Sequence, residues 1–508
     1  MLFDKIPSPV LGAVLLGCTA VLPQQALAQC APTGADSFEC AGIIDGEQEF
    51  AGNGLTVTVL DGAEISHDDH TIRLDEADGD DNTLINGGLI TSSGGDAVKA
   101  EDGFTLENDG EITTTGAGDD GVVVGDEADI TNRGTIRTVD KAVETGDDST
   151  VLNFGLIESV ATDGDTDAVD VGDGSTVVNR VGGQIIATDR AVDMGDDTRL
   201  HNRGLISAGG EAVETGDNAI IKNFATGIIE GVDDALNPGQ NVTIHNWGII
   251  RNIATAADEP QDAIDLDSGD IINHEGAEIT STFDAAIDFD GIERAPGDAV
   301  VVSKIKNMGK IAGKIGILVQ EYDEVEDGEL LPRNVDVQHV INTGELSGET
   351  WAAVLGEGDD IVELHAGSTL NGGIDLGGDD DTLAIFGPGA ISGDYGIFEG
   401  GAGEDLAEFH MIDFFDLIGV SGTAELLTLE FAEALPVSTF SALSAGTPGS
   451  FSYTFANFEL FDFGADDSPT RYTADDLAAM AAVPVPAAGL LLAGGLAGLG
   501  ALRRRRRG

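Results

Sequence analysis

The sequence predicts an all-β chain that winds as a single-stranded parallel β-helix, and three observations predict it. A motif Asn-x-Gly-x-Ile/Leu, with looser copies, returns at intervals of 21 to 35 residues from Asn86 to Asn371. Between the copies, apolar residues alternate over short runs, which is the period of strands and not of helices. Glycine, aspartate and asparagine then interrupt each run. Repeats of about 22 residues with two or three short strands each indicate a solenoid whose coils stack on one another.

The repeated asparagine is expected to form a column along this solenoid. Asparagine tolerates the left-handed backbone of a tight turn, and stacked amides can hydrogen-bond from coil to coil. A polar binding groove is the functional alternative. The regularly spaced members are Asn86, Asn108, Asn132, Asn153, Asn202, Asn246, Asn307 and Asn342, the looser copies begin at Asn179, Asn223 and Asn273, and a last copy begins at Asn371.

A second motif, Ala-Val-acid-x-Gly-Asp, lies between the asparagines. If Val169 and Val171 face inward, Asp170 faces outward together with Ala168. Carboxylates stacked one coil apart repel each other unless a cation or salt screens them. This face is therefore a candidate for binding Ca²⁺ or a cationic polymer, and the alternative is a solvated acidic face. The acidic column consists of Glu144, Asp170, Asp193, Glu214, Asp265 and Asp288.

The charge limits the partners. The 508 residues include 92 acids and only 24 bases, for a formal net charge of −68. A surface this poor in cations gains little from a nucleic acid or from anionic lipid head groups. It favours cations and cationic partners instead.

Three glycine–aspartate runs follow the repeats, beginning at Gly356, Gly377 and Gly400. They resemble the Gly-Gly-x-Gly-x-Asp nonapeptide of RTX calcium rolls, and the resemblance implies Ca²⁺ as a cofactor. The runs are 21 and 24 residues apart instead of nine, so the alternative is a set of acidic turns in continuing coils. The candidate ligands are Asp359, Asp360, Asp380, Asp381 and Asp405.

No motif assigns a catalytic residue. The chain has no Walker loop, dinucleotide fingerprint or nucleophile elbow. His67 and His70 flank two aspartates without a nearby third ligand, which is a weak metal signal. Acids are so frequent that a catalytic carboxylate pair cannot be singled out. We expect no enzyme, and the alternative is a secreted polysaccharide lyase or glycoside hydrolase, because right-handed β-helices also carry those activities.

The N-terminal end is typical of an exported protein. Lys5 precedes an apolar run over residues 10–22, and Ala26-Leu27-Ala28 offers a cleavage site, so residues 1–28 are a predicted signal peptide. Cys30 and Cys40 then form an even pair in an exported chain, which predicts a disulfide. Two free thiols are the alternative.

The C-terminal end reads as a sorting signal over residues 483–508. Residues 487–502 carry no charge and residues 503–507 are all arginine, which predicts a short transmembrane helix with a cytoplasmic basic end. The tail resembles the VPLPA type of PEP-CTERM signals, because it begins with Val483, Pro484, Val485, Pro486 and Ala487. The resemblance implies a transient exosortase-like processing enzyme, a precursor in the inner membrane, and a product at the cell surface or in the extracellular matrix. An ordinary single-span anchor is the alternative.

Between these ends we predict the β-helix over 29–375, acidic coils and a phenylalanine-rich cap over 376–473, and a short helix or linker over 474–482. The cap would cover the last coil and its exposed edge. The body also resembles the β-helical passengers of autotransporter adhesins, although the terminal barrel of that class is missing. This implies a non-catalytic surface or matrix protein that contacts a polysaccharide or a cell-surface partner, and the acidic charge predicts that it binds no nucleic acid.

Overall fold

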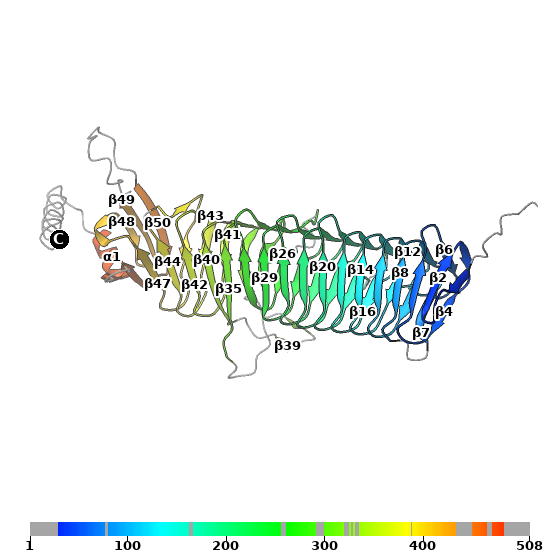
Figure 1. The fold of residues 1–508 in the computed structure, drawn as a ribbon. Coiled ribbons are helices and arrows are strands. Elements are labelled where there is room, and N and C mark those ends of the chain that lie inside the picture. The colour runs from blue at the N-terminus through cyan, green and yellow to red at the C-terminus, as the bar shows by residue number, and fades with distance from the viewer. Residues whose placement is uncertain are drawn as a thin grey trace, which may run out of the picture.

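The computed structural model describes residues 29–76, 80–161, 166–255, 261–290, 299–319, 325–326, 329–330, 335–387, 389–432, 450–464 and 470–481. In this part of the chain the protein is an elongated parallel β-solenoid of about 14 turns (Figure 1). The predicted parallel β-helix is confirmed. At about 4.8 Å per coil, the stack is roughly 70 Å long. The predicted signal peptide and sorting tail lie outside the described residues, and no helix within those residues is long and apolar enough to span a membrane.

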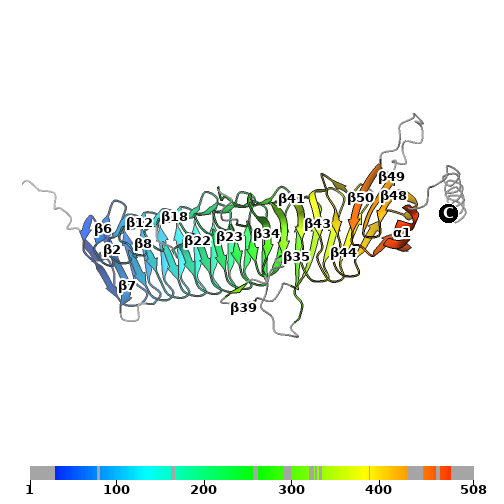
Figure 2. The same ribbon diagram turned by 180° about the vertical axis from the view of Figure 1, so that it is seen from behind.

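Each coil contributes strands to three faces, and each strand pairs with its counterpart one coil away (Figures 1 and 2). The first face contains β2 (Ser37–Ala41), β5 (Thr56–Val59), β8 (Thr83–Asn86), β11 (Thr105–Asn108), β14 (Asp129–Asn132), β17 (Thr150–Asn153), β20 (Thr176–Asn179), β23 (Arg199–Asn202), β26 (Ile220–Asn223), β29 (Val242–Asn246), β32 (Gly269–Asn273), β35 (Val302–Asn307), β40 (Val337–Asn342), β42 (Ile361–Leu364), β44 (Thr382–Phe386), β47 (Leu406–His410) and β51 (Leu460–Phe463).

The second face follows directly after a short turn. It contains β3 (Ile43–Asp45), β6 (Glu64–His67), β9 (Leu89–Ser92), β12 (Glu111–Thr114), β15 (Thr135–Thr138), β18 (Leu156–Ser159), β21 (Gln184–Ala187), β24 (Leu205–Ala208), β27 (Ile228–Gly231), β30 (Ile249–Asn252), β33 (Glu278–Thr280), β36 (Lys310–Ala312), β41 (Glu345–Val354), β43 (Ser368–Asp375) and β45 (Ile391–Ser392).

The third face closes each coil. It contains β4 (Gln48–Ala51), β7 (Ile72–Glu76), β10 (Val98–Ala100), β13 (Val122–Val123), β16 (Val143–Thr145), β19 (Asp167–Val171), β22 (Arg190–Met194), β25 (Val213–Thr215), β28 (Asn237–Pro238), β31 (Asp265–Leu266), β34 (Ala285–Phe289) and β37 (Ile315–Val319), and it continues through the ends of β41 and β43 to β46 (Phe398–Glu399) and β50 (Ser450–Ala456). A separate antiparallel pair joins β38 (Val325–Glu326) and β39 (Glu329–Leu330).

The interior is one continuous apolar core. Inward valine, isoleucine and leucine side chains of all three faces are fully buried, for example Val151, Ile157 and Val169. The prediction that Ala168 faces outward with Asp170 is wrong, because Ala168 is fully buried beside Val169. Two consecutive side chains, those of Ala168 and Val169, point inward where the chain turns into the third face. The first of the two positions therefore takes a small residue.

The asparagine column is a continuous hydrogen-bonded ladder. From Asn86 to Asn307, each side-chain amide donates to the amide oxygen of the next asparagine, over 2.8 to 3.0 Å. The predicted ladder is confirmed, and the looser copies at Asn179, Asn223 and Asn273 take part in it. The predicted left-handed backbone is wrong: these asparagines end strands of the first face, and none has a positive φ.

Asn371 does not belong to the ladder. The position after Asn342 in the column is Leu364, whereas Asn371 pairs with Ser347 on the second face. The Asn371 side chain donates to Ser347 Oγ over 3.3 Å and accepts from the backbone of Asp394 over 3.1 Å. The ladder therefore ends where a leucine replaces the repeated asparagine.

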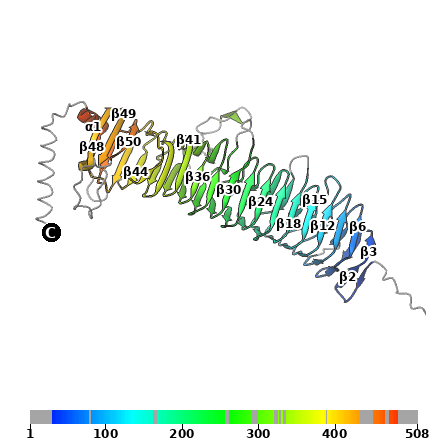
Figure 3. The same cartoon turned by 90° about the horizontal axis from the view of Figure 1, so that it is seen from above.

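Both ends of the stack are covered (Figure 3). At the N-terminal end, β1 (Gln29–Pro32) pairs antiparallel with β2, and the predicted disulfide joins Cys30 to Cys40. At the other end, β48 (Leu417–Thr423) and β49 (Leu426–Ala432) form an antiparallel sheet with β50, and β52 (Thr470–Thr473) pairs with β51. The cap also includes η1 (Phe414–Asp416) and the helix α1 (Ala474–Ala481), whose Leu477 is fully buried. Buried phenylalanines fill this end, as predicted for the cap, and include Phe409, Phe431, Phe455, Phe461 and Phe463.

Candidate functional site

The first half of the predicted acidic column lies in register on the third face. Glu144 pairs with Asp170, Asp170 with Asp193, and Asp193 with Glu214. Asn237 then takes the next position, so the column is interrupted before Asp265 and Asp288, which pair with each other. The sequence therefore identified equivalent positions correctly but not an unbroken row of carboxylates.

Two basic side chains neutralise this first half from within. Arg190 Nη1 lies 2.6 Å from both Asp193 Oδ2 and Glu214 Oε2. Its Nε lies 3.6 Å from Asp167 and 3.5 Å from Glu211. Lys141 forms an ion pair with Asp170. The sequence suggested that a bound cation screens the repulsion between carboxylates of neighbouring coils. Here the protein's own bases, Arg190 and Lys141, reduce that repulsion.

The second half of the column belongs to a cluster of buried carboxyl groups. Burial, and next the charge of Asp288, raise the pKa of Asp262 to about 9. Burial, and then other aspartates of the cluster, raise the pKa of Asp265 to about 9. The backbone N–H of Asp262 donates to Asp234 Oδ1 over 2.7 Å, while Oδ1 of both Asp262 and Asp265 has no hydrogen-bond partner among the described residues. Burial and the neighbouring aspartates therefore favour the protonated form of these carboxyl groups.

The five predicted calcium ligands separate into two columns. Asp360, Asp381 and Asp405 are buried, and their Oδ1 atoms accept backbone N–H groups of Gln338, Asp360 and Asp381 over 2.7 to 3.0 Å. Burial is the first cause that raises the pKa of Asp360 and of Asp381 to about 9.

The other two ligands lie on the outside. Oδ1 of Asp359 accepts the N–H of Asp380 over 3.1 Å, and Oδ1 of Asp380 accepts that of Glu404 over 2.9 Å. Oδ2 of the three inner aspartates has no hydrogen-bond partner among the described residues, and an oxygen donor of that kind suits Ca²⁺. However, no three potential ligand side chains converge anywhere in the described ranges. The runs are continuing coils with laddered aspartates, and calcium binding by them stays a prediction.

A third aspartate ladder explains the Gly-Asp end of the second motif, which the sequence reasoning did not interpret. The Oδ1 atom of each aspartate accepts the backbone N–H of the next one, over 2.8 to 3.0 Å. The preceding glycine is needed because the carboxylate of the previous coil fills the space of a β-carbon. The members are Asp102, Asp126, Asp147, Asp173, Asp196 and Asp217.

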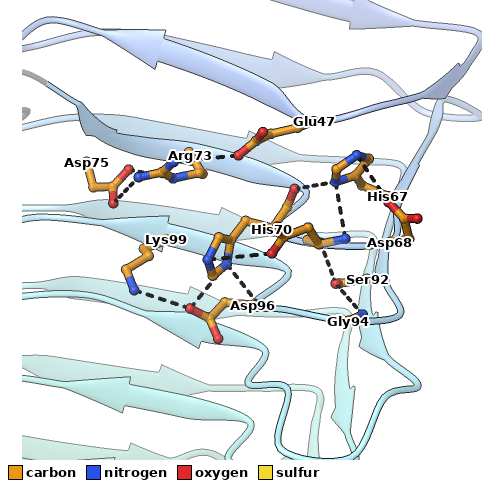
Figure 4. A network of polar contacts seen from close by, with 11 residues as sticks. Glu47, His67, Asp68, His70, Arg73, Asp75, Ser92, Gly94, Asp96 and Lys99 are labelled. Atoms are coloured by element: carbon orange, nitrogen blue, oxygen red, sulfur yellow. Dashed lines mark hydrogen bonds and ion pairs between the residues drawn. The ribbon is translucent and has the colours of Figure 1, made fainter.

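The two histidines of the weak metal signal belong to a polar network (Figure 4). His67 Nδ1 lies 3.1 Å from the carbonyl oxygen of His70. His70 Nδ1 lies 3.4 Å from Asp96 Oδ2, which also lies 3.5 Å from Lys99. The two imidazoles thus serve separate contacts in a turn, and no metal-ligand cluster is found in the described part of the chain.

The sequence reasoning missed a stripe of aromatic and basic side chains, here called the turn stripe. Its members directly follow seven consecutive ladder asparagines, and they stack along the rod in register. The backbone N–H of each donates to the carbonyl of the ladder asparagine one coil earlier. In the sequence, an arginine or an aromatic residue directly follows each of these asparagines, and this pattern could have revealed the stripe. The turn stripe consists of Arg133, Phe154, Arg180, Arg203, Phe224, Trp247 and His274.

The side chains of the turn stripe contact one another. The guanidinium carbon of Arg203 lies 3.6 Å from the ring centre of Phe224. Phe224 stacks on Trp247 with ring centres 5.5 Å apart, and Trp247 stacks on His274 at 4.1 Å. Arg133 and Arg180 each place their guanidinium carbon 5.8 Å from the ring of Phe154, which is 42% exposed.

The surroundings of the turn stripe are basic in an otherwise acidic protein. Beside it on the first face lie Arg199, His201, Lys222, His245 and Lys306. Burial, followed by the charges of Lys222, Arg203, Arg180 and Arg199, lowers the pKa of His201. Burial and then Lys222 also lower the pKa of His245.

Several of these bases have no acidic partner in the described part of the chain. Elsewhere in the described chain, bases such as Arg73, Arg137, Arg190, Arg251 and Arg471 form ion pairs. Within the described residues, no carboxylate lies within ion-pair distance of Arg180, Arg199, Arg203, Lys222 or Lys306. These five bases therefore place positive charge on the first face and its following turn that no ion pair among the described residues offsets.

Comparisons with known proteins give no further assignment: no protein-family model, curated protein or solved structure matches this chain.

Proposed function

We propose that the protein is an exported, non-catalytic rod of the cell surface or extracellular matrix, and that it works by contact along its length. The observation that carries this proposal is the continuous stack itself. The asparagine ladder runs from Asn86 to Asn342, and both ends are covered by antiparallel strands. Such a solenoid presents extended, regularly repeated faces, which suits adhesion or matrix contacts.

The export route in this proposal comes from the two ends of the sequence. A signal peptide over 1–28 and a sorting tail over 483–508 would take the chain through the inner membrane to an exosortase-like enzyme. The disulfide between Cys30 and Cys40 is in keeping with an oxidising compartment. Ca²⁺ is proposed as an accessory ion at the inner aspartate column rather than as a catalytic group.

The rival function is a secreted polysaccharide lyase or glycoside hydrolase. Glycosidases need two carboxyl groups that reach the substrate from opposite sides. Here the carboxyl groups with strongly raised pKa values include Asp262, Asp360 and Asp381, whose side chains are buried. Incubation of the protein with neutral and acidic polysaccharides separates the two functions, because new reducing ends or unsaturated products would support the enzyme.

The route is tested by expressing the full chain in a Gram-negative host with and without an exosortase. With the enzyme, we expect a shortened product at the cell surface or in the medium. Without it, we expect the full-length chain in the inner membrane. A Pro484→Ala/Pro486→Ala variant should behave as if the enzyme were missing. Full-length chain in the membrane of both strains would instead identify an ordinary anchor and refute the proposed sorting.

A further inference from the structure

We propose that the turn stripe and the bases beside it on the first face form a binding track for an acidic, uronate-type polysaccharide that lies along the rod axis. This inference rests on the matrix function proposed above and names its partner. The track comprises the turn stripe together with Arg199, Lys222 and Lys306.

The first argument is electrostatic. The chain has a formal net charge of −68, yet Arg180, Arg203 and Lys222 have no carboxylate within ion-pair distance among the described residues. With so many acids available, pairing these bases would be simple, as it is around Arg190. Unpaired bases gathered on one face leave a local positive potential that attracts anions to this face only.

The second argument is the geometry of the arginines. The guanidinium of Arg203 lies over the ring of Phe224, and that of Arg180 lies near the ring of Phe154, whereas Arg133 already pairs with Asp109 over 3.5 Å. A guanidinium that packs on an aromatic ring can still use its N–H groups to bind a carboxylate bidentately. Because the stacking already restricts these side chains, less conformational entropy is lost when an anion binds.

The third argument is the repeat. Residues of the turn stripe follow one another in register, one per coil, at about 4.8 Å. A ligand with a repeating charge can therefore engage several coils at once, and the linked contacts add through effective concentration. A linear polysaccharide with one carboxylate in each sugar unit has this form.

The fourth argument distinguishes a polysaccharide from a nucleic acid. Phe224 and His274 cover the two faces of Trp247, with ring centres 5.5 and 4.1 Å away. The Trp247 ring, the largest of the turn stripe, therefore does not offer an open face on which a single-stranded base could stack. The remaining acidic surface also repels DNA, whose charge density is one per about 1.7 Å of duplex axis.

The test is calorimetric titration of the full-length chain with polygalacturonate oligosaccharides at low and high NaCl. Uncharged dextran oligosaccharides and a single-stranded DNA oligomer serve as alternative ligands. The test variant is Arg180→Gln/Arg203→Gln. The control is Arg137→Gln, which removes one charge from an exposed arginine on the second face and matches the single-charge change of Lys222→Gln. Circular dichroism melting of each variant shows whether it is folded, and Lys222→Gln provides a second variant on the track that disturbs no ring contact.

We expect the chain to bind polygalacturonate with an affinity that falls as the salt concentration rises. The affinity should fall at least about tenfold in the double variant and by less in Lys222→Gln, and it should be unchanged in Arg137→Gln. Equal binding of dextran, tighter binding of DNA, no binding, or equal affinity in folded track variants would each overturn the inference. A protein that reaches the matrix but does not bind polygalacturonate refutes this inference alone. Conversely, binding by a protein that stays in the inner membrane refutes the proposed function alone.

Discussion

The carboxylate of Asp126 occupies the space beside Gly146 that a side chain at that position would need. A β-carbon on Gly146 would collide with Asp126 Oδ1 and lie 2.9 Å from the Asp126 backbone nitrogen. The same carboxylate accepts the N–H of Asp147 over 2.9 Å, so the glycine and the two aspartates form one unit of the third aspartate ladder.

Gly146→Ala is therefore expected to destabilise the rod by about 1–3 kcal/mol, because the added carbon displaces the Asp126 carboxylate and its hydrogen bond. Thermal melting checks this prediction. Gly378→Ala is the matched control, because its β-carbon would meet no atom closer than 3.7 Å. Equal melting temperatures for the two variants would contradict this explanation of the Gly-Asp motif.

Asn223→Ala should cost more stability than any outward substitution in the same region. The buried Asn223 side chain accepts from Asn202 and donates to Asn246, both over 3.0 Å, so its removal leaves buried partners unsatisfied. We expect a loss of about 2–5 kcal/mol in chemical unfolding. The control Thr243→Ala, at an outward position of β29, should change little. A loss of under about 1 kcal/mol for Asn223→Ala would mean that the ladder is not a main source of stability.

Arg190→Gln should strongly destabilise the third face. The substitution removes the partner of Asp193 and Glu214 and leaves several carboxylates close together. A loss of about 2–4 kcal/mol is expected, with partial recovery in high salt, because ions then screen the repulsion. Arg137→Gln, which breaks a single exposed pair with Glu158, should lose under about 1 kcal/mol. If salt does not help Arg190→Gln more than Arg137→Gln, carboxylate repulsion is not the cause.

The buried carboxyl group of Asp262 predicts a stability that falls with rising pH. Its pKa is raised from 3.8 to about 9, so the folded state holds the proton more tightly than the unfolded state. The resulting stabilisation is complete below pH 3.8 and is lost as the pH rises toward 9. Asp262→Asn, which mimics the protonated group, should reduce the fall in melting temperature between pH 5 and 9 and stabilise the protein by about 1–3 kcal/mol at pH 8. The control Asp129→Asn, at an exposed position, should leave the change of melting temperature with pH as it is in the unaltered protein. If Asp262→Asn also leaves it unaltered, the prediction is wrong.

A calcium contribution at the inner aspartate column is checked by removing the metal. Ca²⁺ bound between the buried Asp360, Asp381 and Asp405 would replace the protons that their raised pKa values favour in the metal-free protein and would stabilise the folded state, so excess EGTA should lower the melting temperature and Ca²⁺ should restore it. Asp381→Asn should lose most of this response, whereas Asp129→Asn should keep it. Identical melting curves with EGTA and with Ca²⁺ would end the calcium hypothesis.

Particular residues show how far the sequence led. Asn86 and its equivalents could be aligned by spacing alone, because a solenoid repeats in space what it repeats in sequence. The same logic placed Asp170 opposite Asp193, and the cysteine pair predicted the contact of Cys30 with Cys40. The alignment by spacing failed at Asn371, where the same sequence motif lies on a different face. It also failed at Ala168, where the chain turns a corner and two neighbouring side chains point inward.

The sequence by itself determined the periodic features of this protein: the coils, the ladder, the first half of the acidic column and the phenylalanine-rich cap. Only the tertiary structure decided which charges meet. Arg190 reaches acids on its own and the next coil, whereas Arg203 lies over Phe224 with no acid beside it among the described residues. The physical reason is that a repeat fixes which backbone positions lie one above another, while ion pairs and ring stacks depend on how side chains from neighbouring coils are directed across the gap between them.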